Sequence, residues 1–321
     1  MARPAATGRG KQRLTVPGGI VDGTYLKAYA VARRYLRREY VTGIAVGYAM
    51  KAGDYIGELA IRIHVQKKRE KATLTKAQCF PEQILGIRVD VIEMNFEPQH
   101  AQGGAAPQGQ GGLRPGARIE TAAGQIGSVG LIVRGKSDHK LYALSAAHVL
   151  RPAGDTVFHP NGSMASNRVG EVTTVLDGVL DAGLVNIGNR QFNNQPSGSA
   201  QQITSIKLVA NKEVLSFAGI HTNTSGCAFY TGEAYFVLPN GETVLLKGFG
   251  MELVENPGNR FTLSGDSGGL WYNADGAAVG LLIGVSTVVY RNPDTGAPTS
   301  KVGFFASHVT EVMRALDVQL P

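Results

Sequence analysis

Short runs of alternating apolar and polar residues, separated by glycine-rich turns, recur through most of this chain, as in residues 242–247. There are 42 glycines but only 11 tyrosines, 11 phenylalanines and one tryptophan. Alternation with a period of two predicts strands that bury one face, and glycine favours the tight turns between antiparallel strands. The sequence therefore predicts a mainly β protein. With 321 residues, 43% of them hydrophobic, the chain can bury the core of more than one domain.

One of the turns carries a candidate nucleophile. Ser267 lies in the sequence Gly-Asp-Ser-Gly-Gly at 265–269, between two apolar, strand-like runs. A serine hydroxyl attacks carbonyl groups poorly unless a base removes its proton and hydrogen-bond donors hold the resulting oxyanion. Because glycine has no Cβ, the backbone can turn so that the amides of Gly265 and Ser267 point into one small oxyanion hole. The motif therefore predicts a partner base elsewhere in the chain.

His148 is the strongest candidate for this base among the seven histidines. It follows the strand-like run 141–145 at a tight turn, and the small side chains of Ala146 and Ala147 allow close packing behind the imidazole. The alternative interpretation is a hydrogen-bonded histidine of the core. Other histidines have weaker settings, in an alternating strand, in polar loops or at the start of the last helix (His64, His100, His139 and His308).

A catalytic histidine also needs a buried carboxylate that holds its tautomer and stabilises the imidazolium. Asp181 opens the run 181–187, in which small residues are followed by strand-like alternation. Asp177 precedes a glycine in a turn-like context. This context favours Asp181. Spacing alone does not separate two acids four residues apart, so Asp177 stays the alternative.

The order His148, Asp181, Ser267, together with Ser-Ala-Ala-His at 145–148 and the motif at 265–269, resembles the chymotrypsin/trypsin-like serine peptidases. The resemblance implies a serine endopeptidase that hydrolyses protein or peptide substrates through an acyl-enzyme. Ser267 is then the nucleophile, His148 the base and Asp181 the group that orients it, and no cofactor or metal is needed.

The resemblance extends beyond these three residues. Residues 301–309 and the amphipathic segment 310–316 resemble the last strand and the C-terminal helix of that family. The similarity covers residues 114–321 and implies two six-stranded antiparallel β-barrels. The first barrel then supplies the histidine and the aspartate, and the second supplies the serine.

An uncharged specificity pocket is also implied. In the family, the residue six positions before the serine lies at the base of this pocket and is an aspartate in enzymes that cleave after lysine or arginine. Here that residue is Phe261. By the same resemblance, Thr262 aligns near the base of the pocket. Ile283, Gly284 and Val285 align along one wall, and Gly303 aligns on the opposite wall. We therefore expect a small or medium apolar side chain at P1.

The N-terminal third has a different character. Residues 1–23 are rich in glycine, proline, alanine and basic residues, which predicts disorder. Residues 24–96 combine a helical stripe with three strand-like runs and predict a small α+β domain in front of the barrels. Residues 97–113 are rich in glycine and glutamine and predict a linker. With the runs 43–47 and 89–93, this arrangement resembles bacterial trypsin-like peptidases related to the plant narrow-leaf proteins.

The net charge of +7 is concentrated in residues 1–112. A basic surface can attract an acidic protein, nucleic acid or anionic lipid. Neither stacking aromatics nor a groove-reading motif accompanies the basic residues, so a solvated basic face is favoured over nucleic-acid binding. We expect this region to mediate self-association or to bind a regulatory partner. The alternative to a peptidase is a latent or inactive trypsin-fold adaptor whose basic N-terminal domain binds a protein or nucleic acid.

Cysteine content and the N-terminal sequence bear on the compartment. Cys79 and Cys227 are the only cysteines, which excludes a disulfide framework and is typical of a reducing compartment. The first nine residues lack the apolar core of a secretory signal, and no run is long enough for a membrane span. We therefore expect a cytoplasmic protein.

Activation by a newly formed N-terminus is not expected. The run Ile-Val-Asp-Gly at 20–23 is similar to the activating N-terminus of trypsin-like zymogens, but it lies too far before His148 for that role. Asp266, the acid before the serine, therefore needs a different partner, such as a backbone amide or an arginine.

Overall fold

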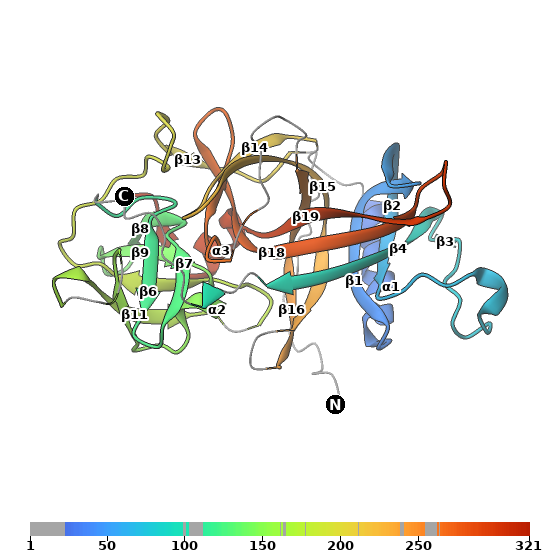
Figure 1. The fold of residues 1–321 in the computed structure, drawn as a ribbon, viewed down its shortest axis with the longest axis horizontal. Helices are drawn as coiled ribbons and strands as arrows, with labels where there is room; N and C mark the ends of the chain where they lie inside the picture. Colours follow the sequence, from blue (N-terminus) through green and yellow to red (C-terminus); the bar gives the residue numbers. More distant parts are fainter. Residues whose placement is uncertain are drawn as a thin grey trace.

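The computed structural model describes residues 23–98, 101–102, 112–160, 162, 165–176, 178–210, 212–237, 241–253, 262 and 264–321. Strands dominate these residues and form two large sheets, as the alternating runs predict. Figure 1 shows one sheet at one end of the molecule, and the long strands of the other extending away from it. The predicted disorder of residues 1–23 falls almost wholly outside the described residues.

The first sheet carries the candidate base and its aspartate. It has nine strands in the order β20-β8-β9-β12-β11-β10-β6-β7-β5. Alternate side chains of these strands, among them Ile119, Ile132 and Val185, form a fully or almost fully buried core. The strands are β5 (Ala101–Gln102), β6 (Arg118–Thr121), β7 (Gln125–Ser128), β8 (Leu131–Gly135), β9 (Leu141–Ser145), β10 (Thr156–Phe158), β11 (Arg168–Val175), β12 (Gly183–Asn186) and β20 (Val318–Gln319).

The second sheet carries the candidate nucleophile. Its order is β14-β17-β18-β19-β16-β15-β1-β2-β4-β3, with β13 beside β18, and β4 also pairs with β18. The strands are β1 (Val41–Lys51), β2 (Asp54–Val65), β3 (Gln83–Ile84), β4 (Ile87–Pro98), β13 (Ser205–Ile206), β14 (Val214–Ala218), β15 (Asn223–Val237), β16 (Thr243–Leu253), β17 (Leu270–Tyr272), β18 (Ala277–Arg291) and β19 (Pro298–His308).

Helices are short and pack against the sheets. The α-helices are α1 (Gly23–Ala32), α2 (Ala147–Leu150) and α3 (Val309–Ala315), and the 3-10 turns are η1 (Arg33–Arg37), η2 (Lys71–Thr73) and η3 (Ala165–Asn167). The helix predicted at 310–316 is thus confirmed, and α3 begins and ends one residue earlier than predicted. Val309 and Val312 of α3 pack into a cluster that contains Leu144 of the first sheet and Leu281 of the second. This shared core holds the two sheets against each other.

The strands of the N-terminal third belong to the second sheet. β1 pairs antiparallel with β15, and β4 pairs antiparallel with β18. These pairings satisfy backbone groups that would otherwise be exposed along sheet edges. The predicted division at residue 96 stays a prediction, but the sheet itself runs across it. Of the predicted linker 97–113, Glu97 and Pro98 end β4, residues 101–102 form β5, and Leu113 is buried. Residues 99–100 and 103–111 lie outside the described residues.

Candidate active site

His148 and Asp181 form a buried, hydrogen-bonded pair. His148 lies in α2, directly after β9, and Asp181 lies two residues before β12, which pairs with β9. The Asp181 carboxylate accepts the main-chain N–H of His148 at 2.9 Å through Oδ1, and its Oδ2 lies 2.5 Å from Nδ1 of the imidazole. The side chains are 3% and 5% exposed, so water scarcely screens their interaction. Asp177, the alternative acid, lies outside the described residues.

The charge of this pair fixes which imidazole nitrogen can act as a base. Burial raises the pKa of the Asp181 carboxyl, but the positive charge of His148 and the hydrogen bonds from its ring and main chain outweigh burial. The pKa of Asp181 therefore lies below its ordinary value. An ionised carboxylate can only accept hydrogen bonds, so the proton shared between Asp181 and His148 must be carried by Nδ1. In the neutral ring, Nε2 is then the nitrogen that can accept a proton.

Ser267 lies in a tight turn that only glycine permits. Gly265 has a φ of +102° and Gly268 a φ of +81°, both in the left-handed region. A Cβ on Gly268 would lie 2.3 Å from Ser145 Oγ and 2.7 Å from the main-chain nitrogen of Ala146. The turn therefore packs directly against the end of β9, three residues before His148. Ser267 itself is fully buried.

Ser128, at the end of β7, holds this turn at both ends. Its main-chain N–H donates to the Ser267 carbonyl at 2.8 Å, and its hydroxyl donates to the Gly265 carbonyl at 3.2 Å. Its own carbonyl accepts the Ser145 hydroxyl at 2.7 Å. Ser128 thereby connects the first sheet to the turn that carries both predicted oxyanion donors. The sequence does not predict this residue's contacts, because a serine at the end of a strand carries no local signal of such a role.

Asp266 is bound by a main-chain amide. Its Oδ1 accepts the N–H of His221 at 2.8 Å, and the side chain is fully buried. The neighbouring N–H of Ile220 donates to the Ser128 hydroxyl at 3.1 Å. The expectation that Asp266 binds a partner other than a new N-terminus, a backbone amide being one choice, agrees with this contact.

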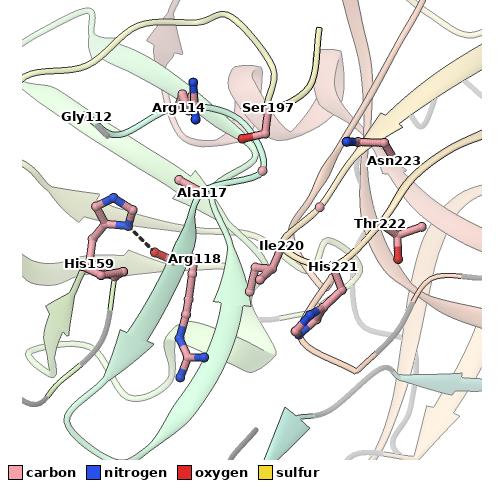
Figure 2. A pocket seen from close by; sticks show the side chains of 13 residues that line it. Gly112, Arg114, Ala117, Arg118, His159, Ser197, Ile220, His221, Thr222 and Asn223 are labelled. Carbon is pink, nitrogen blue, oxygen red and sulfur yellow. Dashed lines mark hydrogen bonds between the residues drawn. The ribbon is translucent and has the colours of Figure 1, made fainter. Parts of the chain in front are cut away.

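A cavity of about 260 Å³ is lined in part by the segment that binds Asp266. Figure 2 shows Ile220, His221 and Thr222 along one side, with Arg118 and His159 opposite. The His159 ring bonds the main-chain carbonyl of Arg118 at 2.6 Å. The segment 219–222 therefore both lines this cavity and binds Asp266 of the Ser267 turn.

The predicted specificity residues are distributed over different surroundings. Ile283 is buried in a cluster with Phe96, Tyr230 and Phe305, whereas Val285 packs beside a different cluster that contains Phe304. Thr262 is buried. Gly303 of β19 pairs with Ser286 of β18, and Gly284 contacts β4. Phe261, the predicted base of the pocket, lies outside the described residues.

Three further observations on the described residues concern metal ligands, thiols and helix length. Among them, no group of three or more histidine, cysteine, aspartate or glutamate side chains could hold a metal ion. Both cysteines are free thiols. No helix in the described part of the chain is long and apolar enough to cross a membrane.

The fold of this chain can be compared with those of known proteins. No family model and no curated protein matches the chain. Among solved structures, a glutamic acid-specific serine protease that uses a histidine triad in substrate binding aligns with a TM-score of 0.50 at 19% identity, covering 65% of this chain and 100% of that one. Cellulomonas bogoriensis chymotrypsin aligns with a TM-score of 0.45 at 18% identity, covering 65% and 98%. The first likeness shows that the two sheets have the predicted chymotrypsin-like fold.

Proposed function

We propose that this chain is a serine endopeptidase. The observation that carries the proposal is the buried Asp181–His148 pair, placed against a glycine turn that bears Ser267. In the first step, Nε2 of His148 takes the hydroxyl proton while Ser267 Oγ attacks the substrate carbonyl carbon. The imidazolium then gives this proton to the leaving amine, which leaves an acyl-enzyme. Water, deprotonated by the same nitrogen, hydrolyses the ester to release the acid and restore the hydroxyl.

The main-chain amides of Gly265 and Ser267 are proposed to stabilise the oxyanion. Donors that are held in place before the reaction stabilise developing charge without a cost of reorganisation. The two bonds from Ser128 and the bond between Asp266 and His221 restrain the carbonyls and the acid of this same turn. We therefore assign Ser128 as a positioning residue, which acts through the turn and not on the substrate.

For substrates, we retain the apolar P1 preference implied by Phe261, Thr262 and the residues of β18 and β19. A panel of peptides that differ only at P1 tests it, and faster cleavage after arginine than after alanine, valine or leucine would refute it. The narrower resemblance to narrow-leaf-related peptidases, the cytoplasmic location and a regulatory or self-associating role of the N-terminal region stay predictions.

Labelling by a fluorophosphonate probe tests the proposed activity, because the probe reacts with activated serines. We expect the native chain to be labelled, and Ser267→Ala and His148→Ala to lose labelling. Ser264→Ala is the matched control, since this exposed serine lies only three residues before Ser267. Labelling of the native chain that survives Ser267→Ala would overturn the assignment. A native chain that takes no label would favour the inactive adaptor.

A further inference from the structure

A second cavity, of about 390 Å³, lies at the end of the second sheet that the N-terminal third builds. It is lined by Val65 at the end of β2, by Val89 and Val91 of β4, by Tyr40 before β1, and by residues of the segment 66–82 between β2 and β3. Figure 1 shows β2 and β3 at the opposite end of the molecule from the first sheet, which carries the candidate base. The cavity is therefore separate from the candidate active site.

Much of the lining of this cavity is apolar. Val65 is 3% exposed and belongs to the hydrophobic cluster on this side of the sheet. The half-buried side chains of Val89, Val91, Tyr40 and Phe80 pack against the same cluster. An apolar group that entered the cavity would remove this surface from water, which is the main favourable term in association. The lining therefore favours a ligand with an apolar body.

Arg38 holds one wall of the cavity in place. Its guanidinium donates to the Tyr40 hydroxyl at 2.9 Å. It also donates to the main-chain carbonyls of Gln78 and Cys79, at 3.3 and 3.4 Å. The same group lies 4.8 Å from the centre of the Phe80 ring, within the range of a cation–π contact. A wall that is fixed before binding lowers the cost of ordering the site around a ligand.

Basic side chains line the same cavity. Four of its lining residues are basic and one is acidic (Lys67, Lys68, Arg69 and Lys71; Glu82). Lys71 pairs with Glu82 at 2.8 Å. Lys67, Lys68 and Arg69 are exposed, and none of them forms an ion pair within the described part of the chain. Three cations without a paired carboxylate thus lie beside an apolar lining, which is complementary to an anion with an apolar body.

The two longest segments outside the described residues do not have the charge of such a ligand. Residues 1–22 contain four basic residues and a single acid, Asp22. Residues 103–111 contain no charged residue. A basic segment is repelled by the cations at the cavity, and an uncharged one leaves them unpaired. The complementary ligand therefore comes from outside this chain.

We propose that this cavity binds a small amphipathic anion, an alkyl carboxylate of the fatty-acid type. The alkyl chain contacts the apolar lining along β2 and β4, and the carboxylate pairs with Lys67, Lys68 and Arg69. A cavity of about 390 Å³ falls within the size range of small-molecule sites, about 300–1,000 Å³. An inorganic anion leaves the apolar lining uncovered, and a neutral apolar molecule leaves the cations unpaired. Binding at this cavity does not require the endopeptidase function proposed above.

Isothermal titration calorimetry of the full-length chain with straight-chain carboxylates tests the proposal. We expect saturable binding whose affinity rises about fourfold with each methylene from hexanoate to decanoate, since a buried CH₂ contributes about 0.8 kcal/mol. Acetate, which has the charge without the chain, should show no detectable binding. Octanol, which has the chain without the charge, should bind about tenfold more weakly than octanoate. An affinity that does not depend on chain length, or octanol that binds as tightly as octanoate, would overturn the proposal.

A pair of matched charge variants locates the binding site. Lys67→Gln/Arg69→Gln removes two cations at the cavity and should weaken decanoate binding about fivefold. Lys27→Gln/Lys76→Gln removes the same charge from exposed residues that do not line the cavity, and should bind decanoate like the native chain. All four side chains are exposed, so both variants should keep the native Tm. Equal weakening in the two variants would mean attraction by net charge alone and would contradict a site at this cavity.

Cys79 reports occupancy of the cavity in the native chain. It is half-buried and lines the cavity, whereas Cys227 of β15 does not and serves as an internal control. Alkylation by iodoacetamide, followed by peptide mass mapping, measures both thiols in one sample. Decanoate should slow alkylation of Cys79 in proportion to its calorimetric saturation and leave Cys227 unchanged. Binding that protects neither thiol, or both equally, would overturn the proposal, as would an acidic peptide that binds where decanoate does not.

Discussion

Replacing Asp181 by asparagine preserves the shape of the side chain and changes one hydrogen-bonding atom. In the native protein Oδ1 accepts the His148 main-chain N–H, and Oδ2 lies 2.5 Å from Nδ1. The asparagine oxygen can still accept the main-chain N–H, which turns the amide nitrogen towards Nδ1 as a donor. Nδ1 must then be the acceptor, and the neutral ring carries its proton on Nε2. In this tautomer His148 cannot take the proton of Ser267.

The size of the effect follows from the tautomer and from burial. In serine peptidase triads, this exchange lowers kcat by on the order of 10⁴-fold, which is about 5.5 kcal/mol of transition-state stabilisation. The Asp181 side chain is 5% exposed, so solvent offers no alternative acceptor to restore the native tautomer. Folding should change little, because the variant retains the main-chain hydrogen bond and the volume of the side chain.

The assay is steady-state hydrolysis of a peptide substrate at pH 8, with a thermal melt to confirm folding. We expect Asp181→Asn to lower kcat by three to four orders of magnitude, with a small change in KM. Asp177→Asn is the matched control and should keep native kcat. If Asp181→Asn stays within tenfold of native activity while Asp177→Asn does not, the assignment of the orienting carboxylate is refuted.

Three further predictions concern groups around this site and in the supporting sheet. Ser128→Ala removes the hydroxyl that donates to the Gly265 carbonyl and accepts the Ile220 N–H, so it should lower kcat with little change in KM and cost about 1–3 kcal/mol of stability; equal kinetics for Ser128→Ala and the native chain would contradict its positioning role. Burial, with the Lys247 charge, lowers the pKa of His308 to about 3, so the unfolded chain binds a proton below about pH 6.5 that the folded chain does not. The free energy of unfolding should therefore fall as the pH drops from about 6.5 towards 3, by up to about 1.4 kcal/mol per pH unit. In urea unfolding at several pH values, His308→Gln should show a smaller fall than the native chain. The same dependence on pH in both proteins would exclude His308 as the cause. Arg33→Met leaves the buried Glu233 carboxylate without its bidentate partner and should cost about 3–5 kcal/mol in chemical denaturation, with a smaller loss for Arg33→Lys; equal losses would contradict the ion-pair explanation.

Features with a local physical cause could be predicted from the sequence. Alternation at 242–247 predicts a strand, and these residues fall almost wholly within β16, although both faces of that strand are buried from Leu246 on. The glycines around Ser267 predict a left-handed backbone conformation that other residues rarely adopt. The φ values of Gly265 and Gly268 confirm this. The setting of Asp181 before a strand likewise agrees with its contact to His148. In each case the evidence lies within about ten residues of the feature.

Features that depend on pairing between distant segments could not be predicted. Alternation specifies which face of a strand is buried, and it does not name the neighbouring strand. Alternation in the runs at 41–65 therefore gives no indication that β1 pairs with β15. The glycine- and glutamine-rich composition after residue 96 suggested a linker for the same reason, although Glu97 and Pro98 complete β4. The amide that binds Asp266 is a further example, because a main-chain donor has no residue-specific signal.

Gly284 is a sequence feature whose physical cause becomes clear only when its neighbouring strand, β4, is known. It lies in the interior of β18, between Ile283 and Val285, and an interior strand glycine commonly marks a close approach of another backbone. Resemblance alone placed it on the wall of a specificity pocket. The structure supplies a cause that does not depend on resemblance, since a Cβ at this position would lie 2.2 Å from the Glu97 carbonyl oxygen. The two interpretations converge, because the same edge of β18 that would receive a substrate already receives residues 93–98 of this chain. An external peptide that paired with this edge of β18 would therefore compete with residues 93–98, whose local concentration is set by covalent linkage.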